Sequence, residues 1–404
     1  MSKFSFDEAL QHLLAAAVPV QEKENLAIEV ALGRVLAEGQ TSAIEVPPHD
    51  NSAMDGYALR SADVPVAGMR LPVSQRIPAG AIGHALQAGT AARIFTGAPV
   101  PAGADGVVMQ ELCDHTGDLV TINHVPKPGE NIRRRGEDIA LGAEVVPAGT
   151  RLNPQALGLL ASVGIARVPV WRRLRVALFS TGNELVNPGQ PLPPGGIYNS
   201  NRYLLKGLLE RLGCEVTDLG IVADTLADTR QALRQAAGGH DLILTSGGVS
   251  VGEEDHVKPA VEAEGALSLW AIAIKPGKPL AFGHVNAADG SKAAFIGVPG
   301  NPVAAFVTFI LLVRPFIRRC QGLSAAAVPA LRLPVAFDWK KSDPRRNFLR
   351  VRVNAEGQLE LFANQGSGVL TSTLWSDGLA DVAPGQTLTK GDVVSYLPFT
   401  ALMD

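Results

Sequence analysis

The sequence predicts a multidomain protein of α/β and β structure whose largest part is a mainly parallel sheet covered by helices. Three observations predict this. Strand-like and helix-like runs alternate regularly from residue 174 onward. Residues 44–140 are rich in proline and glycine with short β-like runs, and helical periodicity vanishes after about residue 324. With 404 residues, 46% of them hydrophobic, the chain is long enough for several cores.

Helical segments lie on both sides of the proline- and glycine-rich stretch. "MSKFSFDEALQHLL" predicts a helix capped by Ser5, with Glu8 at the capping-box position. "EVALGRVLAE" (29–38) predicts a second short helix. Farther on, Asn153 as the cap and Pro154 in the first turn predict another helix.

These segments divide the chain into four expected domains. Residues 1–43 and 141–173 resemble each other in type, so together they are expected to form an elongated helical domain. Residues 44–140 would then be an inserted β-rich domain. The α/β domain spans 174–323, and 324–404 form a C-terminal β domain, a small barrel or sandwich.

The α/β domain is read from its alternation. Strands are predicted at "RVALFS", "EVTDLGIV" and "DLILTS", with helices at "SNRYLLKGLLERLG", "TLADTRQALRQAAGG" and "NPVAAFVTFILLVRPFIRRC". Three of its loops are polar and glycine-containing and follow strands: residues 180–185, 245–255 and 297–302. Because ligands bind beyond the carboxyl ends of parallel strands, we expect all three loops to open onto one edge and form a phosphate-type site.

The polar atoms of these loops divide into donors and metal ligands. Glu184 and Asp255 could hold Mg²⁺, which prefers carboxylates together with phosphate oxygens. Glu184 could instead be a carboxylate at a helix N-terminus, which is the favoured interpretation of Glu253 and Glu254. The candidate donors to an oxyanion are Ser246, Gly247, Gly248, Ser250 and Gly252.

Other polar residues near these loops have two interpretations each. Lys275 and Lys278 lie on a proline-flanked turn, where they could grip a charged group or be solvated. Asp224 could contact an adenosine ribose or a metal, or cap a turn. In "PPHDNSAMDGYALR" (47–60), Asp55 lies in a crowded polar loop that could equally be structural.

Charge and cysteine content exclude some classes of protein. Lysine and arginine number 36 against 39 acidic residues, so no global basic field favours nucleic acid or membrane binding. The three cysteines, Cys113, Cys214 and Cys320, form no CxxC pair, which favours a reducing compartment. No apolar run is long enough to span a bilayer, and the N-terminus lacks a signal core. We expect a cytoplasmic protein.

Six blocks then show a specific resemblance. They are "DNSAMDGYALR", "RIFTGAPVPAGADGVVMQE", "STGNEL", "TSGGVSVGEED", "IKPGKPLAFG" and "VPGNPVAAF". They resemble the signature blocks of the molybdopterin molybdenumtransferase family, which includes MoeA and the E domain of gephyrin. Weaker matches, "DPRRNFLRV" and "NQGSGVLTS", extend the likeness over nearly the whole chain. The α/β domain is therefore expected to be of the molybdopterin-binding type.

The resemblance implies an enzyme that inserts molybdate into adenylylated molybdopterin with Mg²⁺ and releases AMP. It implies four domains, a homodimer with an active cleft between subunits, and transient contact with molybdopterin adenylyltransferase and downstream cofactor carriers. It places functional positions at Asp55, Thr96, Glu184, Asp224, Asp255, Lys275, Arg345 and Ser367. The block "VPGNP" adds Pro299, Gly300, Asn301 and Pro302 to the substrate-binding candidates, and the turn adds Lys278.

The expected chemistry is charge compensation. Pyrophosphate and molybdate are both strongly negative, so Mg²⁺ on Asp255 and Glu184, with Lys275 and Arg345, would neutralise them. No covalent nucleophile is required. Thr96 and Ser367 would donate hydroxyls, or merely close turns. One departure is Ala271, where many relatives carry a basic residue.

Two other functions fit parts of the pattern. The stand-alone molybdopterin adenylyltransferase shares the α/β domain and the "SGG" loop, but lacks the "DNSAMDGYA" block. A gephyrin-like scaffold is the non-enzymatic alternative, although nothing in the sequence indicates a receptor-binding extension.

Overall fold

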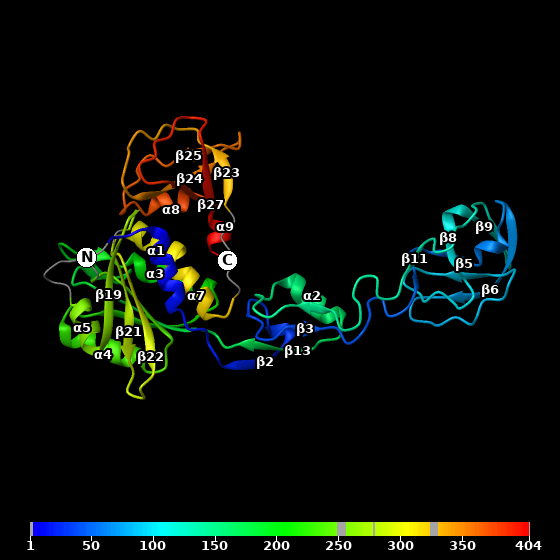
Figure 1. The fold of residues 1–404 in the computed structure, drawn as a ribbon, viewed down its shortest axis with the longest axis horizontal. Helices are drawn as coiled ribbons and strands as arrows, with labels where there is room; N and C mark the ends of the chain where they lie inside the picture. The colour runs from blue at the N-terminus through cyan, green and yellow to red at the C-terminus, as the bar shows by residue number, and fades with distance from the viewer. Residues whose placement is uncertain (1–2, 249–255, 278, 324–329, 404) are drawn as a thin grey trace. The chain divides into compact units, whose positions relative to one another are not determined.

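The computed structural model describes residues 3–248, 256–277, 279–323 and 330–403 (Figure 1). It divides into two compact units. Unit 1 comprises residues 1–24, 33–37 and 170–404, and unit 2 comprises 25–32 and 38–169. Each unit is described by itself below.

Unit 1 contains a seven-stranded sheet. Its strands in spatial order are β1 (Lys3–Phe4), β19 (Gly265–Ile272), β21 (Pro279–Asn286), β22 (Lys292–Val298), β18 (Leu242–Ser246), β14 (Arg175–Thr181) and β17 (Glu215–Val222). Four of the six neighbouring pairs are parallel, and only β21 pairs antiparallel on both sides. The predicted mainly parallel sheet is confirmed.

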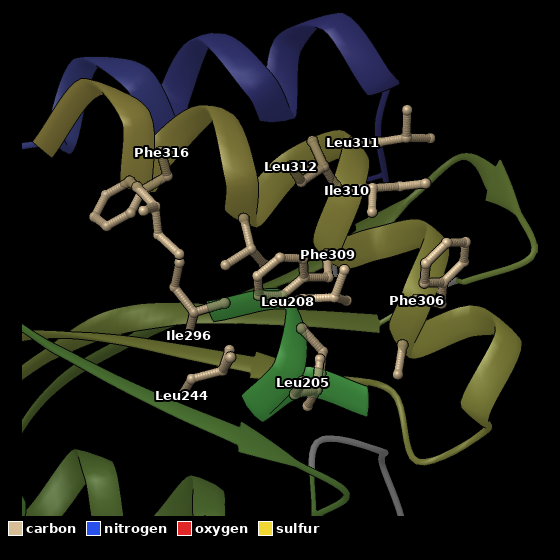
Figure 2. Packing of buried hydrophobic residues seen from close by; sticks show 14 of the residues in the cluster. Leu205, Leu208, Leu244, Ile296, Phe306, Phe309, Ile310, Leu311, Leu312 and Phe316 are labelled. Atoms are coloured by element: carbon tan, nitrogen blue, oxygen red, sulfur yellow. The ribbon is translucent and has the colours of Figure 1, made fainter. Parts of the chain in front are cut away.

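Helices cover both faces of this sheet. Those of unit 1 are α1 (Phe6–Ala16), α3 (Ser200–Arg211), α4 (Leu226–Ala237), α5 (Val257–Glu264), α6 (Pro302–Thr308), the π-helical segment η4 (Phe309–Val313) and α7 (Arg314–Cys320). Strand residues alternate between the two cores. Leu178 and Leu244 pack with α3, α6, η4 and α7, as Figure 2 shows for Leu244, whereas Phe179 and Ile243 pack with α4 and α5.

The first helix corrects the expected domain boundary. Ser5 caps α1 in the predicted capping box: its hydroxyl accepts from the Glu8 amide, and the Glu8 carboxylate accepts from the Ser5 amide. However, residues 1–24 belong to unit 1 and 141–169 to unit 2, so these two segments are not grouped together as the sequence predicted. The physical reason is that Ala9 and Leu13 are fully buried in the same core as η4 and α7.

A second sheet of unit 1 is formed mostly by the C-terminal residues. It contains β20 (Ile274–Lys275), β24 (Arg346–Val353), β26 (Gly378–Val382), β27 (Val393–Pro398) and β23 (Leu331–Pro334), with β25 (Leu359–Leu361) paired to β24. Two short helices, α8 (Thr371–Trp375) and α9 (Phe399–Leu402), accompany it. Edge-to-face rings join it to the first core: Phe6 lies 5.4 Å from Phe348, and Phe306 lies 5.2 Å from Phe399. The short pair β15 (Leu185–Val186) and β16 (Ile197–Tyr198) completes unit 1.

Unit 2 is built around a six-stranded sheet. Its order is β8 (Gly106–Met109), β5 (Gly56–Leu59), β7 (Ala91–Ile94), β6 (Met69–Ile77), β10 (Leu119–Ile122) and β9 (Cys113–Thr116). Smaller pairs are β4 (Asn51–Ser52) with β11 (Ile132–Arg133), and β3 (Gln40–Thr41) with β12 (Glu144–Val146). Helix α2 (Pro154–Ser162) begins as predicted, because the Asn153 side chain accepts from the Ala156 amide.

The predicted helix at 29–38 is wrong. Only a 3₁₀ turn forms there, η1 (Ile28–Val30), and Gly33 adopts a left-handed φ of 74°. Leu36 then pairs as a single bridge with Val170. Pairing with a distant strand residue therefore overrides the local helical pattern. Two strands of five residues each, β2 (Lys23–Ala27) and β13 (Arg167–Trp171), pair with each other.

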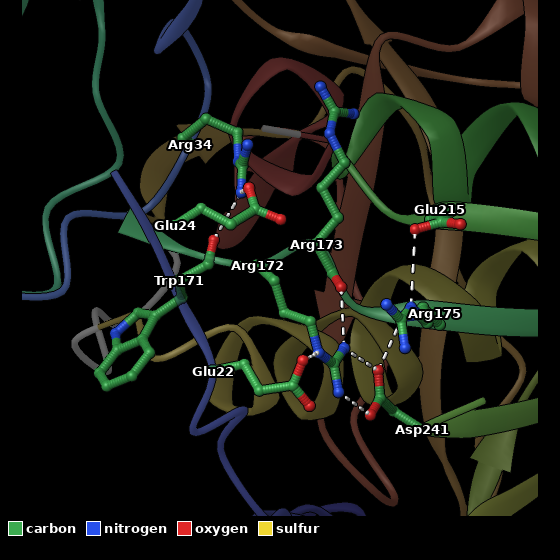
Figure 3. Close-up of polar contacts among 9 residues, drawn as sticks. All are labelled: Glu22, Glu24, Arg34, Trp171, Arg172, Arg173, Arg175, Glu215 and Asp241. Atoms are coloured by element: carbon green, nitrogen blue, oxygen red, sulfur yellow. Dashed lines mark hydrogen bonds and ion pairs between the residues drawn. The ribbon is translucent and has the colours of Figure 1, made fainter. Parts of the chain in front are cut away.

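An ion-pair network anchors the ends of these segments within unit 1 (Figure 3). Arg172 donates to both carboxylate oxygens of Asp241 at 2.7 and 2.8 Å, and it pairs with Glu22 at 3.0 Å. Asp241 also accepts from the Arg175 amide at 2.8 Å. These bonds raise the pKa of Arg172, foremost through Asp241.

Over the described residues, no helix is long and apolar enough to cross a membrane.

Replacing Asp241 by Asn should lower the free energy of unfolding by about 2 kcal/mol, because it leaves the poorly exposed Arg172 without its bidentate partner. Chemical denaturation measures this. The matched control is E215Q: its partner Arg175 lies 3.8 Å away and both side chains are exposed, so the change should stay below about 1 kcal/mol. Equal effects of the two substitutions would contradict the assigned role of Asp241.

Candidate functional site

Parallel pairing brings four strand ends of unit 1 to one edge. The register aligns Ser180 of β14 with Ser246 of β18, and Ser246 with Val298 of β22. On the other side of β14, Thr181 is aligned with Val222 of β17. The loops that follow these strands therefore begin at the same edge of the sheet, as the sequence predicted for three of them.

Short polar contacts connect these loops. Thr181 donates its hydroxyl to the Asp224 carboxylate at 3.0 Å, so Asp224 is held against the end of β14. The Ser180 and Ser246 hydroxyls lie 3.3 Å apart in a fully buried position. The Gly247 amide donates to the Val298 carbonyl at 3.2 Å. Because of this bond, the Gly247 N–H already has an acceptor within the protein.

The two glycines after β18 are required by their surroundings. Gly247 and Gly248 have φ values of 86° and 62°, in the left-handed region that favours glycine. A Cβ at Gly247 would lie 3.0 Å from the Thr181 carbonyl, and one at Gly248 would collide with the Val257 side chain. The backbone therefore approaches the neighbouring strand end and α5 closely.

The "PGNP" loop lies beside these glycines. A Cβ at Gly300 would be 3.7 Å from the Gly247 Cα, and the Gly300 carbonyl accepts from the side-chain Nδ2 of Asn201 at 2.7 Å. Pro302 opens α6, after Asn301 at the cap position and Pro299 in the loop. Amides in the first turn of a helix have no acceptor within the helix, and the Val303 amide donates instead to the Ser367 carbonyl at 3.0 Å. Ser367 is thereby placed beside the loop.

A buried arginine supports the segment that carries Ser367. Arg350 is 1% exposed, and burial lowers its pKa to about 10. It donates to the Gly366 and Phe348 carbonyls and to the Ser372 hydroxyl, each at 3.3 Å. Sequence reasoning missed this residue, because nothing in "FLRV" distinguishes a buried arginine from an exposed one.

Glu184 is exposed at the same edge. Its carboxylate lies over Gly182, where a Cβ would be 2.7 Å from Oε2. The alternative interpretation, a helix N-terminus, is wrong, because β15 and not a helix follows it. Ser250, Gly252, Asp255 and Lys278 lie outside the described residues, as do Glu253 and Glu254. Within the described ranges, no group of three His, Cys, Asp or Glu side chains is placed to hold a metal ion.

A second cluster of unit 1 contains two predicted cations. Lys275 Nζ lies 3.2 Å from Asp343 Oδ2, while Arg345 donates to both oxygens of Asp343 at 2.9 and 2.8 Å. Arg345 foremost, with Lys275, lowers the pKa of Asp343. One carboxylate thus orients both cations. Sequence reasoning missed Asp343, although "DPRR" offered the signal of an acid two residues before a basic pair.

Asp55 and Thr96 lie together in unit 2. Asp55 Oδ1 accepts from the Thr96 amide at 2.7 Å and from its hydroxyl at 2.8 Å. The amide bond is the main cause of the lowered pKa of Asp55. His49, in the loop before Asp55, is exposed. The predicted residues therefore form two clusters in unit 1 and one in unit 2.

Comparison with known proteins covers nearly the whole chain. Residues 4–164 match the MoeA N-terminal region (domain I and II), 177–319 match a probable molybdopterin binding domain, and 332–399 match the MoeA C-terminal region (domain IV). The chain is 40% identical over 407 aligned positions to the molybdopterin molybdenumtransferase of Haemophilus influenzae, covering 99% of both chains.

Two further relatives agree. The molybdopterin molybdenumtransferase of Synechococcus elongatus is 36% identical, covering 95% of this chain and 96% of that one. The crystal structure of the molybdopterin biosynthesis MoeA protein from Pyrococcus horikoshii is similar with a TM-score of 0.85 and 28% identity, covering 98% of this chain and 99% of that one.

Gly248→Ala should destabilise the protein by more than the ~1–2 kcal/mol expected for a left-handed φ alone, because the new methyl group collides with Val257. The control is G195A, where φ is 80° and nothing lies within 4 Å of the added Cβ. Chemical unfolding of both variants separates the two terms. Equal losses of stability would show that the close approach to α5 has no energetic weight.

The Asp343 carboxyl should make stability depend on pH. Its pKa is lowered in the folded state, so its contribution is complete well above the unfolded value of ~3.9 and is lost as pH falls below it. We expect D343N to flatten the rise of unfolding free energy between about pH 2 and pH 5. Urea unfolding at a series of pH values tests this, and an unchanged slope would contradict it.

Proposed function

Because the chain belongs to the molybdopterin molybdenumtransferase family, we propose that it inserts molybdate into adenylylated molybdopterin, releases AMP and so completes the molybdenum cofactor. The observation that carries this proposal is the match along the full chain, with 40% identity over 99% of the Haemophilus influenzae protein. A likeness confined to the α/β domain would have fitted the adenylyltransferase alternative equally well. The MoeA N- and C-terminal matches favour the insertion step.

The strand-end edge of unit 1 is proposed as the substrate site. Backbone groups around Gly248 would donate to substrate oxyanions, with Ser250 and Gly252 adding donors from the same loop. Asp224, held by Thr181, would contact the nucleotide end. Ser367 and the residues 299–302 would border the same site, because the Ser367 carbonyl bonds the first turn of α6.

Charge compensation would be the main contribution to catalysis. Lys275 and Arg345 share the carboxylate of Asp343, which holds their cationic groups in fixed positions before substrate arrives. A negatively charged substrate then meets cations that need little reorientation. Lys278 would add a further cation from the same turn. No covalent nucleophile on the protein is needed for this chemistry.

Mg²⁺ is the proposed metal, and its ligands would be Glu184 and Asp255. The exposed carboxylate of Glu184 at the strand-end edge fits a hard cation that keeps several waters. When bound, the ion would neutralise phosphate oxygens and lower the repulsion between the two anionic substrates. The residues around it would position those substrates and exclude competing reactions with water.

Asp55 and Thr96 of unit 2 are proposed to act in a homodimer, where they would complete the cleft of a neighbouring subunit. A four-domain organisation remains part of the proposal, with residues 1–24 grouped with the α/β domain. A cytoplasmic location and transient contacts with molybdopterin adenylyltransferase and cofactor carriers belong to it as well.

The assay combines the full-length protein, adenylylated molybdopterin, Mg²⁺ and molybdate, and measures AMP. We expect AMP release that depends on molybdate, and we expect D255N to reduce its rate at least about 100-fold while leaving a folded protein. The control E253Q should retain activity, because Glu253 is assigned no catalytic role.

Two outcomes would contradict this function. Consumption of ATP with molybdopterin in the absence of molybdate would support adenylylation instead. Full molybdate-dependent activity of D255N would show that this carboxylate plays no catalytic part.

A further inference from the structure

Two arginines of unit 2 share one aromatic ring. Arg76 on β6 and Arg93 on β7 are direct partners in the parallel pairing of these strands, so their side chains stand on the same face of the sheet. Their guanidinium carbons lie 4.6 and 4.7 Å from the centroid of the Phe95 ring. Arg93 also lies 5.2 Å from the Tyr57 ring. Cation–π contacts therefore fix both cations beside Phe95.

Within the described part of unit 2, neither arginine has a direct ionic partner, although the charge of Arg93 interacts with the Asp55 carboxylate. No ion pair is formed there by Arg76 or Arg93. Arg93 instead donates to two neutral acceptors, the Gly56 carbonyl at 3.2 Å and the Gln110 side-chain oxygen at 2.5 Å. Like charges directly opposite each other on a sheet destabilise it. Repulsion between the two arginines therefore lowers the stability of the folded protein, and a bound anion would offset this loss.

The nearest candidate site residues lie next to this pair. Phe95 precedes Thr96 in the sequence, and Thr96 holds the carboxylate of Asp55 through its amide and its hydroxyl. Both of these bonds go to Asp55 Oδ1, which is thus directed to Thr96. Asp55 is in this way hydrogen-bonded by a neutral partner, although its charge also interacts with Arg93. Both arginines keep N–H donors for another acceptor.

We propose that Arg76, Phe95 and Arg93 form a binding site for a tetrahedral oxyanion of the substrate, either a phosphate group or molybdate. The planar guanidinium matches a tetrahedral oxyanion with two parallel N–H···O bonds, and Phe95 holds two such groups in place before binding. The site deepens the proposed function, on which it rests, because it adds substrate contacts beside Asp55 and Thr96. The bound anion also attracts both guanidinium groups, which offsets their mutual repulsion.

Thermal unfolding of the full-length protein tests the site without any turnover. Inorganic pyrophosphate, AMP and molybdate are added separately, with chloride keeping the ionic strength constant because salt alone screens the arginine pair. The wild-type Tm should rise with at least one of these oxyanions. Arg76→Gln should remove that rise, and its own Tm without anion should equal or exceed that of the wild type.

The control is R70Q, an exposed arginine on the same strand β6 that loses the same charge. It should keep the full anion-dependent rise in Tm. A rise with pyrophosphate and AMP assigns the site to the phosphates of the substrate, and a rise with molybdate assigns it to the metal oxyanion. No rise in the wild type, or an equal rise in the wild type and R76Q, would overturn the proposal.

Kinetics separate this inference from the function on which it rests. In the AMP-release assay, R76Q should raise the KM for the substrate whose oxyanion binds here by about tenfold, as expected for one lost charge-assisted bond, with R76K intermediate. An unchanged KM in an active enzyme overturns the oxyanion site alone. Absence of AMP release by the wild type would instead overturn the proposed function.

Discussion

The parallel register of β22, β18, β14 and β17 is the constraint on which the unit 1 site depends. Parallel strands all end at the same edge, so loops separated by more than a hundred residues in the chain start side by side. Helices on both faces bury the sheet and hold that register. Glycine is needed directly after β18, because a side chain at Gly248 would collide with Val257 of α5.

Carboxylates orient the cations around this framework. Asp343 holds Lys275 and Arg345 beside the second sheet, and Asp241 holds Arg172 at the base of β14. The two acids have different consequences. The cations at Asp343 are partly exposed and remain open to a further anion, whereas Arg172 is poorly exposed and serves the architecture of unit 1.

The arginine pair of unit 2 lacks such a carboxylate among the described residues. Phe95 contacts both cations, and two neutral oxygens accept from Arg93, which fixes direction without neutralising charge. An enzyme that brings anionic substrates together needs cations of this kind, since an arginine already paired with an acid attracts a further anion less strongly. Under this proposal, the carboxylate-paired cations of unit 1 and the arginine pair of unit 2 would both bind anionic groups of the substrates.

Patterns readable in the amino-acid sequence predicted the local structure: the capping box at Ser5, the start of α2 at Pro154, the alternation of strands and helices, and the glycine-rich strand ends. These features depend on residues close together in the chain. The family resemblance likewise rests on short contiguous blocks of sequence. Tertiary structure alone decided that α1 packs with unit 1, that residues 29–38 form no α-helix, and that Asp343 and the Arg76–Arg93 pair meet their partners. Burial, strand pairing and charge contacts join residues far apart in the chain, and no local pattern records which of them will meet.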